Sequence, residues 1–177
     1  MKRKLIVFAV LFSVAAFCVP AESFLSDYDR EIVATCMVLE AGGEGPEGMQ
    51  AVLNVIFNRA GGYLHRIIPE TIRYGAFSCM SSIWRKEAPD YSPLIRRASN
   101  QPGAYGQAMQ LIALMEDGFL QDNTGGATHY HAASISPYWI SGMRYLTTIG
   151  NHIFYTERPR QIARLYDENS SEINIKL

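Results

Sequence analysis

The chain has 177 residues, 48% of them hydrophobic and 19% charged, and its formal net charge at pH 7 is −1. This size and balance fit one globular domain with a proper hydrophobic core. A charge this close to zero gives no support for nucleic-acid binding through bulk electrostatics.

The first residues have the pattern of a secretory signal. Basic residues at 2–4 precede an apolar run over 5–17, and the residues that follow allow cleavage after Ala21. The run is too short to span a membrane comfortably. A phenylalanine precedes Cys18 where a lipobox needs a small residue, so cleavage is favoured over lipid anchoring or a buried helix. We expect residues 1–21 to be a signal peptide and the mature chain to be exported, to the periplasm or the extracellular space, without a stable membrane span.

Export would change both the charge and the redox environment of the chain. Loss of three positive charges lowers the formal net charge from −1 to −4, which again argues against a nucleic-acid partner. Two cysteines, Cys36 and Cys79, remain after position 21. An exported protein can carry a disulfide, but two buried free thiols fit the sequence equally well.

A first helix is expected to begin near Ser26. This serine can cap the helix, and the acids at 27 and 29 favour its positive end. A helical stripe of apolar residues follows at positions 32, 33, 36, 37 and 39. Glu40 lies one turn after Cys36, on the edge of that stripe. We therefore expect the Glu40 carboxylate to be partly buried near the end of the helix.

A glycine turn separates this helix from a second one. Ala41-Gly42-Gly43 interrupts the pattern, Glu44 lies in the turn, and Pro46 suits the first position of the next helix. A buried face with helical spacing is formed by Met49, Val52, Leu53 and Ile56. A second row carries amides at four-residue spacing, namely Gln50, Asn54 and Asn58. These amides could hydrogen-bond sugar hydroxyls or hold neighbouring loops.

The middle of the chain is irregular and basic. Residues 63–102 lack long periodic segments. Between positions 59 and 97 there are seven Arg or Lys residues against three acids. This basic midsection could face an anionic polymer or form a solvated loop surface.

The last part of the chain changes from helix to sheet. Helical spacing predicts a third helix over 103–119, whereas alternation over 127–132 predicts a strand. Residues 145–156 have the pattern of a hairpin around Gly150. We therefore predict an α+β fold with a helical N-terminal part, a small antiparallel sheet near the C-terminus, and a polar tail at 157–177.

Two groups of side chains could support catalysis. Glu40 and Glu44 could serve as the acid and the second carboxylate of a glycoside-cleaving site, although each could also be a surface acid. His129 and His131 lie on one face of the predicted strand, and His152 could complete a zinc site in which Glu40 is the base. Structural or substrate-contacting roles for these histidines are the alternative. Signatures of serine hydrolases, P-loops, dinucleotide sites and H-E-x-x-H zinc enzymes are absent from the sequence.

The residues around Glu40 resemble a known family motif. Leu39 to Glu44, followed by 47–52 and Asn58-Arg59, is similar to the opening motif of the SleB/CwlJ-type cell wall hydrolases. Phe77-Ser78 resembles the central F-S element of that family. Three segments resemble its C-terminal end, namely 127–131, 137–139 and 148–155. The resemblance covers roughly residues 31 to 156, and the domain is expected over 22–156.

The resemblance implies a peptidoglycan-cleaving enzyme with a lysozyme-like or lytic-transglycosylase-like fold and no cofactor. The first Glu of the family motif falls on Glu40, which would protonate the bond between N-acetylmuramic acid and N-acetylglucosamine. Gly42 stands where the motif has an Arg. A single dominant carboxylate would favour attack by the substrate's own hydroxyl, whereas Glu44 pointing into the cleft would favour hydrolysis.

Side chains other than the two glutamates complete the predicted site. We expect substrate contacts from Gln50, Tyr130, His131, Trp139, Thr148 and His152. Each of them also has a competing structural role. Two other functions stay open on the sequence: a zinc-dependent cell wall amidase that uses the three histidines, and a non-catalytic glycan-binding protein.

Overall fold

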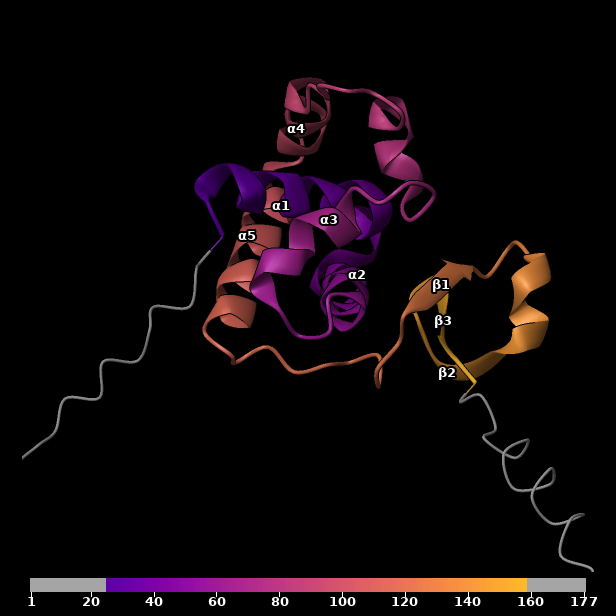
Figure 1. The fold of residues 1–177 in the computed structure, drawn as a ribbon. Coiled ribbons are helices and arrows are strands. Elements are labelled where there is room, and N and C mark those ends of the chain that lie inside the picture. Colours follow the sequence, from indigo (N-terminus) through magenta and orange to yellow (C-terminus); the bar gives the residue numbers. More distant parts are fainter. Residues whose placement is uncertain (1–24, 159–177) are drawn as a thin grey trace, which may run out of the picture.

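The computed structural model describes residues 25–158, which form a helical part followed by a small sheet (Figure 1). The helices are α1 (Asp27–Ala41), α2 (Gly45–Arg59), α3 (Ile67–Thr71), α4 (Ser92–Ser99) and α5 (Pro102–Glu116). The strands are β1 (His129–Ala132), β2 (Met143–Ile149) and β3 (His152–Glu157). They pair antiparallel in the order β1-β3-β2. The predicted α+β fold is confirmed. Helix α5 corresponds to the third predicted helix, and β2 and β3 form the predicted hairpin around Gly150.

Two of the predicted segments fall mostly outside this description. The expected signal segment at 1–21 and the tail residues 159–177 lie outside the described residues. Within 25–158, no helix is both long enough and apolar enough to cross a membrane.

Helix α1 forms where the sequence predicts it. The Ser26 hydroxyl accepts a hydrogen bond from the Asp29 N–H at 3.1 Å, and the Asp29 carboxylate accepts one from the Ser26 N–H at 3.4 Å. This reciprocal cap satisfies two N–H groups that the helix itself leaves free. Val33, Cys36 and Met37 are fully buried, so the apolar stripe faces the core as predicted.

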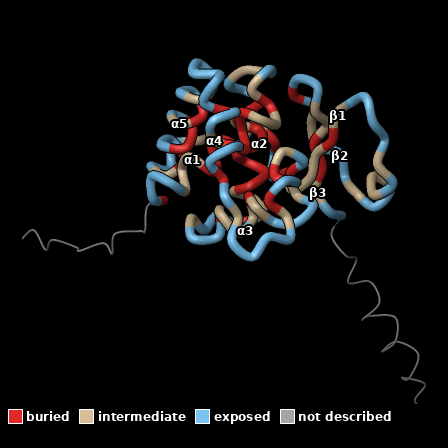
Figure 2. Tube along the Cα trace, turned by 90° about the horizontal axis from the view of Figure 1, so that it is seen from above, coloured by how far each residue is buried: buried red, intermediate tan, exposed pale blue. Residues whose placement is uncertain are grey.

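The core has two parts, of which the larger lies among the helices. Helices α1, α2 and α5 pack on one another, and the buried segments of the chain run mainly through α1 and α2 (Figure 2). A smaller cluster connects α2 to the sheet and contains Ala51, Val55, Ala127, Ile149 and Phe154. Helix α2 therefore serves both sides: one face packs on α1 and another supports the sheet.

The irregular middle of the chain contains short helices that the sequence did not reveal. Besides α3 and α4, the segment holds the 3-10 helix η3 (Ser78–Ile83), which buries Met80 and Ile83 in the larger core. Helices of one or two turns are too short to show a full hydrophobic period. The structure of these short helices therefore depends on their packing against α1 and not on a pattern in their own sequence.

The amide row on α2 holds the loop that leads into β1. The Gln50 side chain donates to the Gln121 carbonyl at 2.7 Å, and Asn54 donates to the same carbonyl at 3.2 Å. Asn58 donates to the Ala127 carbonyl at 3.0 Å. Of the two roles considered for this row, the structure therefore shows loop anchoring, which fixes the position of β1 on α2.

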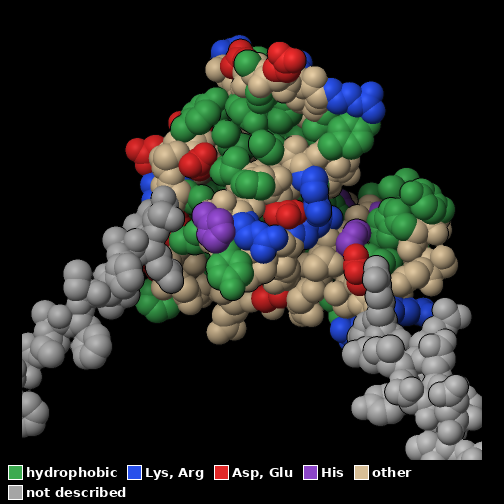
Figure 3. Space-filling model, viewed as in Figure 1, with side chains coloured by type: hydrophobic (Ala, Val, Ile, Leu, Met, Phe, Trp, Pro, Cys, Tyr) green, Lys and Arg blue, Asp and Glu red, His purple; other side chains and the backbone are tan. Residues whose placement is uncertain are grey.

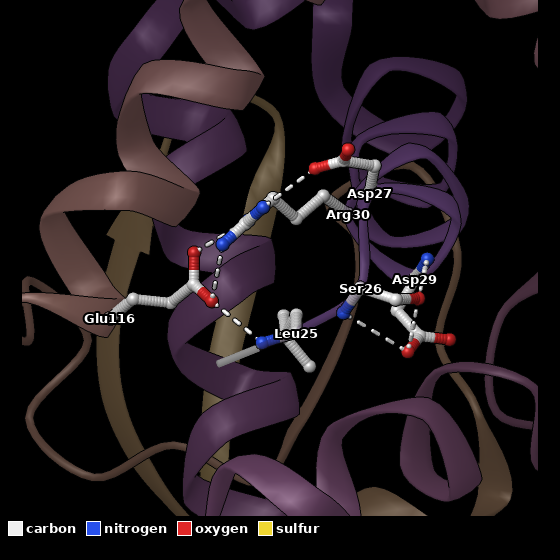
Figure 4. Close-up of polar contacts among 6 residues, drawn as sticks. All are labelled: Leu25, Ser26, Asp27, Asp29, Arg30 and Glu116. Carbon is white, nitrogen blue, oxygen red and sulfur yellow. Dashed lines mark hydrogen bonds and ion pairs between the residues drawn. The ribbon is translucent and has the colours of Figure 1, made fainter. Parts of the chain in front are cut away.

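A buried carboxylate ties the end of α5 to the start of α1 (Figure 4). Glu116 accepts from the Leu25 N–H at 2.8 Å and from the Arg30 guanidinium at 2.8 and 3.2 Å. Its side chain is 3% exposed. A carboxylate at the C-terminal end of a helix opposes the helix dipole, so these donors are needed to offset the cost of placing it there.

We expect Glu116→Gln to lower the free energy of unfolding by about 1–3 kcal/mol, because one Arg30 contact becomes neutral and the amide turns a donor toward other donors. Asp27→Asn is the matched control, since Asp27 pairs with the same Arg30 but its side chain is 98% exposed. Denaturant unfolding should show little change for the control. Equal effects of the two variants would contradict this role for Glu116.

Candidate active site

A cleft of about 450 Å³ lies between the helical part and the sheet. In the space-filling view the surface is notched between these two parts (Figure 3). The helical side contributes Leu39, Glu40, Gly75, Ala76 and Ser78. The sheet side contributes Tyr130, His131, Ala132, Ile135, Pro137, Trp139 and His152. We call this site the Glu40 cleft, since Glu40 is the only acid that lines it within residues 25–158.

Three donors hold the Glu40 carboxylate at the end of α1. Oε1 accepts from the Cys79 N–H at 2.8 Å and from the Ser78 hydroxyl at 3.1 Å. Oε2 accepts from the Tyr130 hydroxyl at 3.0 Å. These donors come from η3 and β1, so the carboxylate lies where three separate segments meet, and its direction is fixed by both sides of the cleft.

Tyr130 is the donor that comes from the sheet. Its ring packs against those of Phe154, with centroids 5.5 Å apart, and His152, at 4.9 Å, and the Phe77 ring lies 6.2 Å away. Burial, followed by the negative charge of Glu40, raises the pKa of the Tyr130 phenol well above its usual value. Tyr130 therefore stays protonated near neutral pH and remains a donor to Glu40.

Glu44 lies beside the cleft and contacts His152, one of the residues that line it. Its Oε1 is 2.8 Å from His152 Nδ1, and the two side chains are only 13% and 12% exposed. Glu44 itself is not among the residues that line the cleft, whereas His152 is. Two glycines make room for this carboxylate: a Cβ on Gly48 would lie 2.6 Å from the Glu44 Cβ, and a Cβ on Gly150 would collide with the Glu44 carboxylate.

The strand register separates the three histidines considered as zinc ligands. His152 on β3 pairs with Ala132 and so shares a face with Tyr130, whereas His129 and His131 occupy the other face. Both ring nitrogens of His131 have partners, the Ala132 carbonyl at 2.8 Å and the Tyr155 hydroxyl at 3.2 Å. Within residues 25–158, no three His, Cys, Asp or Glu side chains are grouped to hold a metal ion. The three-histidine zinc site is therefore wrong, because register and competing hydrogen bonds keep its members apart.

The other predicted contacts divide between the cleft and sites outside it. Trp139 lines the cleft, and its ring lies 5.7 Å from that of His131. Thr148 is exposed on β2, with its hydroxyl 3.3 Å from that of Tyr145, and does not line the cleft. Gln50 does not line it either, since its amide is used to hold the loop at Gln121.

Two partners of Glu40 had no assigned role on the sequence. Ser78 belongs to Phe77-Ser78, which resembles the central F-S element of the family. That resemblance is the one sequence signal that pointed to Ser78. The Cys79 contact is made by a backbone N–H, which every residue except proline carries, so no side-chain pattern could reveal it.

The two cysteines of the described residues lie side by side beneath Glu40. Their Sγ atoms are 3.9 Å apart, and both thiols are free. Burial raises the pKa of the Cys36 thiol well above its usual value, and the neighbouring Cys79 adds to the effect. The Cys36 thiol is therefore a poor nucleophile, and Cys79 has a structural role, since its backbone N–H holds Glu40.

Comparison with solved structures identifies the class of the fold. The catalytic domain of the germination-specific lytic transglycosylase SleB from Bacillus anthracis is similar at 22% identity and a TM-score of 0.53, covering 75% of this chain and 97% of that one. The catalytic domain of Bacillus cereus SleB is similar at 22% identity and the same TM-score, covering 74% of this chain and 91% of that one. The fold is thus that of the SleB catalytic domains. No curated protein matches the chain.

The family follows from the sequence. The model of the Cell Wall Hydrolase family matches residues 43–155, which is more than half of the chain, and the chain belongs to this family. It is therefore an enzyme that acts on peptidoglycan, as the resemblance implied.

We expect a thiol oxidant to join Cys36 to Cys79 without unfolding the protein, because the sulfurs need to close by only about 2 Å. Mass spectrometry of a digest should detect the Cys36–Cys79 cross-linked peptide after treatment with oxidised glutathione. Cys79→Ser should abolish that peptide and keep the melting temperature nearly unchanged. A pair that stays reduced in the native protein but cross-links in denaturant would contradict this geometry.

Proposed function

We propose that this cell wall hydrolase cleaves the glycan strand of peptidoglycan between N-acetylmuramic acid and N-acetylglucosamine, with Glu40 as the general acid. The observation that carries the proposal is the Glu40 carboxylate, the one acid lining the cleft within 25–158, oriented by three donors. Its match to the first Glu of the family motif supports the same assignment. In this role, protonated Glu40 gives its proton to the glycosidic oxygen as the bond from that oxygen to C1 breaks.

A lytic transglycosylase route is the version that the geometry favours. In this route the C6 hydroxyl of the muramic acid attacks C1 and forms an anhydro-sugar. A classical pair of opposed carboxylates is not needed, and Glu44 lies outside the set of cleft-lining residues. The Bacillus anthracis neighbour is itself named a lytic transglycosylase, which supports the proposal by analogy of fold.

His152 is the proposed base of this reaction. Its Nδ1 is engaged by Glu44 at 2.8 Å, which favours the tautomer with a proton on Nδ1 and leaves a lone pair on Nε2. Among the described residues, Nε2 has no hydrogen-bond partner, and the ring lines the cleft. His152 would thus accept the proton of the attacking hydroxyl while Glu40 donates one to the leaving oxygen.

The place of action follows from the substrate. Peptidoglycan lies outside the cytoplasmic membrane, so we infer that residues 1–21 direct export and that residues 22–156 act as the catalytic domain in the periplasm or outside the cell. The family match at 43–155 lies inside that range and supports it.

Glu40→Gln should abolish clearing of a cell-wall suspension, with a rate loss of about 10²–10⁴-fold, because the amide cannot donate a proton to the leaving oxygen. Glu47→Gln is the control, since Glu47 is exposed on α2 away from the cleft. A Glu40→Gln enzyme with near-normal activity would refute the assignment.

The products of the same digest separate the two routes. Mass spectrometry should show muropeptides that end in an anhydro-sugar, one water lighter than the hydrolytic products. Saturated reducing ends would instead mean that water attacks. That result would remove the transglycosylase step while leaving Glu40 as the acid.

We expect His152→Ala to lose about 10²-fold in rate and to recover part of it in added imidazole, because free imidazole can enter the vacated space and take the proton. His65→Ala, at an exposed histidine of the helical part, should change nothing. If His152 only supports the Tyr130 ring, the loss will remain but imidazole will not restore the rate.

A further inference from the structure

A second cavity, of about 400 Å³, lies where α2 meets the sheet. Its helical side includes Arg59 and Arg73, and its sheet side includes Thr128, His129 and Glu157. We call it the Arg59 pocket. It is lined by charged and hydrogen-bonding side chains, and the proposed glycan chemistry makes no use of it.

Arg59 is a shielded cation without a matching anion. Its Nε donates to the Thr128 carbonyl at 2.6 Å, and the guanidinium lies 5.2 Å from the centroid of the Phe77 ring. Its Nη1 is buried and has no hydrogen-bond partner. No carboxylate within residues 25–158 forms an ion pair with it. Burial, followed by the charge of Arg73, lowers the pKa of Arg59, and Glu70 offsets only part of this shift.

The second guanidinium lies closer to solvent. Arg73, two residues after the end of α3, pairs with Glu70 of that helix at 3.0 Å, and the Arg73 side chain is 51% exposed. Glu70 and Glu157 offset part of the positive charge. Burial, followed by the charge of Arg59, lowers the pKa of the His129 imidazole, and Glu157 partly opposes this shift. Lys and Arg side chains gather in the middle of this face, beside the junction with the sheet (Figure 3).

Residues that line the pocket lie close to residues that line the Glu40 cleft at two places. Trp139 lines the cleft, and its ring lies 5.7 Å from that of His129 in the pocket. On the opposite edge, Arg73 lines the pocket while Gly75 and Ala76 line the cleft. A substituent on a sugar bound in the cleft could therefore reach the guanidinium groups.

We propose that the Arg59 pocket binds a carboxylate of the peptide stem attached to the muramic acid. The inference rests on the proposed function, because it requires the glycan strand to lie in the Glu40 cleft. Peptidoglycan stems contain D-glutamyl and terminal carboxylates, and arginine is the side chain best shaped to bind a carboxylate through two hydrogen bonds. The pocket would make the enzyme selective for strands that still carry their peptides.

The test compares two substrates in the full-length enzyme. One is peptidoglycan with intact stems, and the other is glycan strands whose stems have been removed by an amidase. Arg73→Gln should lower kcat/KM on the stem-bearing substrate about tenfold, mainly through KM, which is the effect of losing one charge-assisted contact. On bare strands it should match the unmodified enzyme. Arg97→Gln, at an exposed arginine of α4, is the matched control on both substrates.

Two results would overturn the pocket assignment. One is an equal loss on both substrates, which would mean that Arg73 supports the fold or the chemistry. The other is no loss on either. If the unmodified enzyme cleaves neither substrate, the proposed function fails instead, and titration with a free stem peptide followed by NMR decides the pocket separately. Binding that Arg73→Gln weakens supports the pocket, and equal or absent binding refutes it.

Discussion

The hydrogen bonds to the Glu40 carboxylate are the interaction on which the site depends. They join the end of α1, the 3-10 helix η3 and strand β1, three segments that are distant in sequence. A carboxylate at a helix end opposes the helix dipole and, when partly shielded, needs donors. The structure satisfies that need with groups from both walls of the cleft. The same bonds therefore orient the Glu40 carboxylate and link the helical part to the sheet.

The sheet can supply its donor only because α2 positions it. Ala51 and Val55 of α2 pack against apolar side chains of the sheet. The amide side chains of the same helix hold the loop that leads into β1. Tyr130 is then carried to Glu40 by a strand that is fixed at its start and packed from below. A small three-stranded sheet is only marginally stable alone, so packing on the helical part stabilises the face that carries Tyr130 and His152.

Local pattern was sufficient for the long elements and for the partial burial of Glu40 near the end of α1. Helices α1, α2 and α5 and the hairpin at Gly150 have clear periodicity and capping or turn signals. The contacts that define the site are not local: the register that separates His152 from His129 and the Cys79 N–H at Glu40 depend on packing between distant segments. Thr148 was predicted to contact substrate, but it lies on β2, which β3 separates from β1, and it does not line the cleft.

The turn between α1 and α2 explains why two nearby carboxylates have different environments. At Gly42, where the related motif has an Arg, a Cβ would already lie 3.3 Å from both Gln101 and Val38, so the start of α5 occupies the space of a larger side chain. Glu44 instead enters a recess that Gly48 and Gly150 leave open, where His152 is its partner. Glu40 remains at the cleft surface. Two glutamates four residues apart thus have different surroundings: the Glu40 carboxylate lines the cleft, whereas the Glu44 carboxylate is paired with the His152 imidazole behind it.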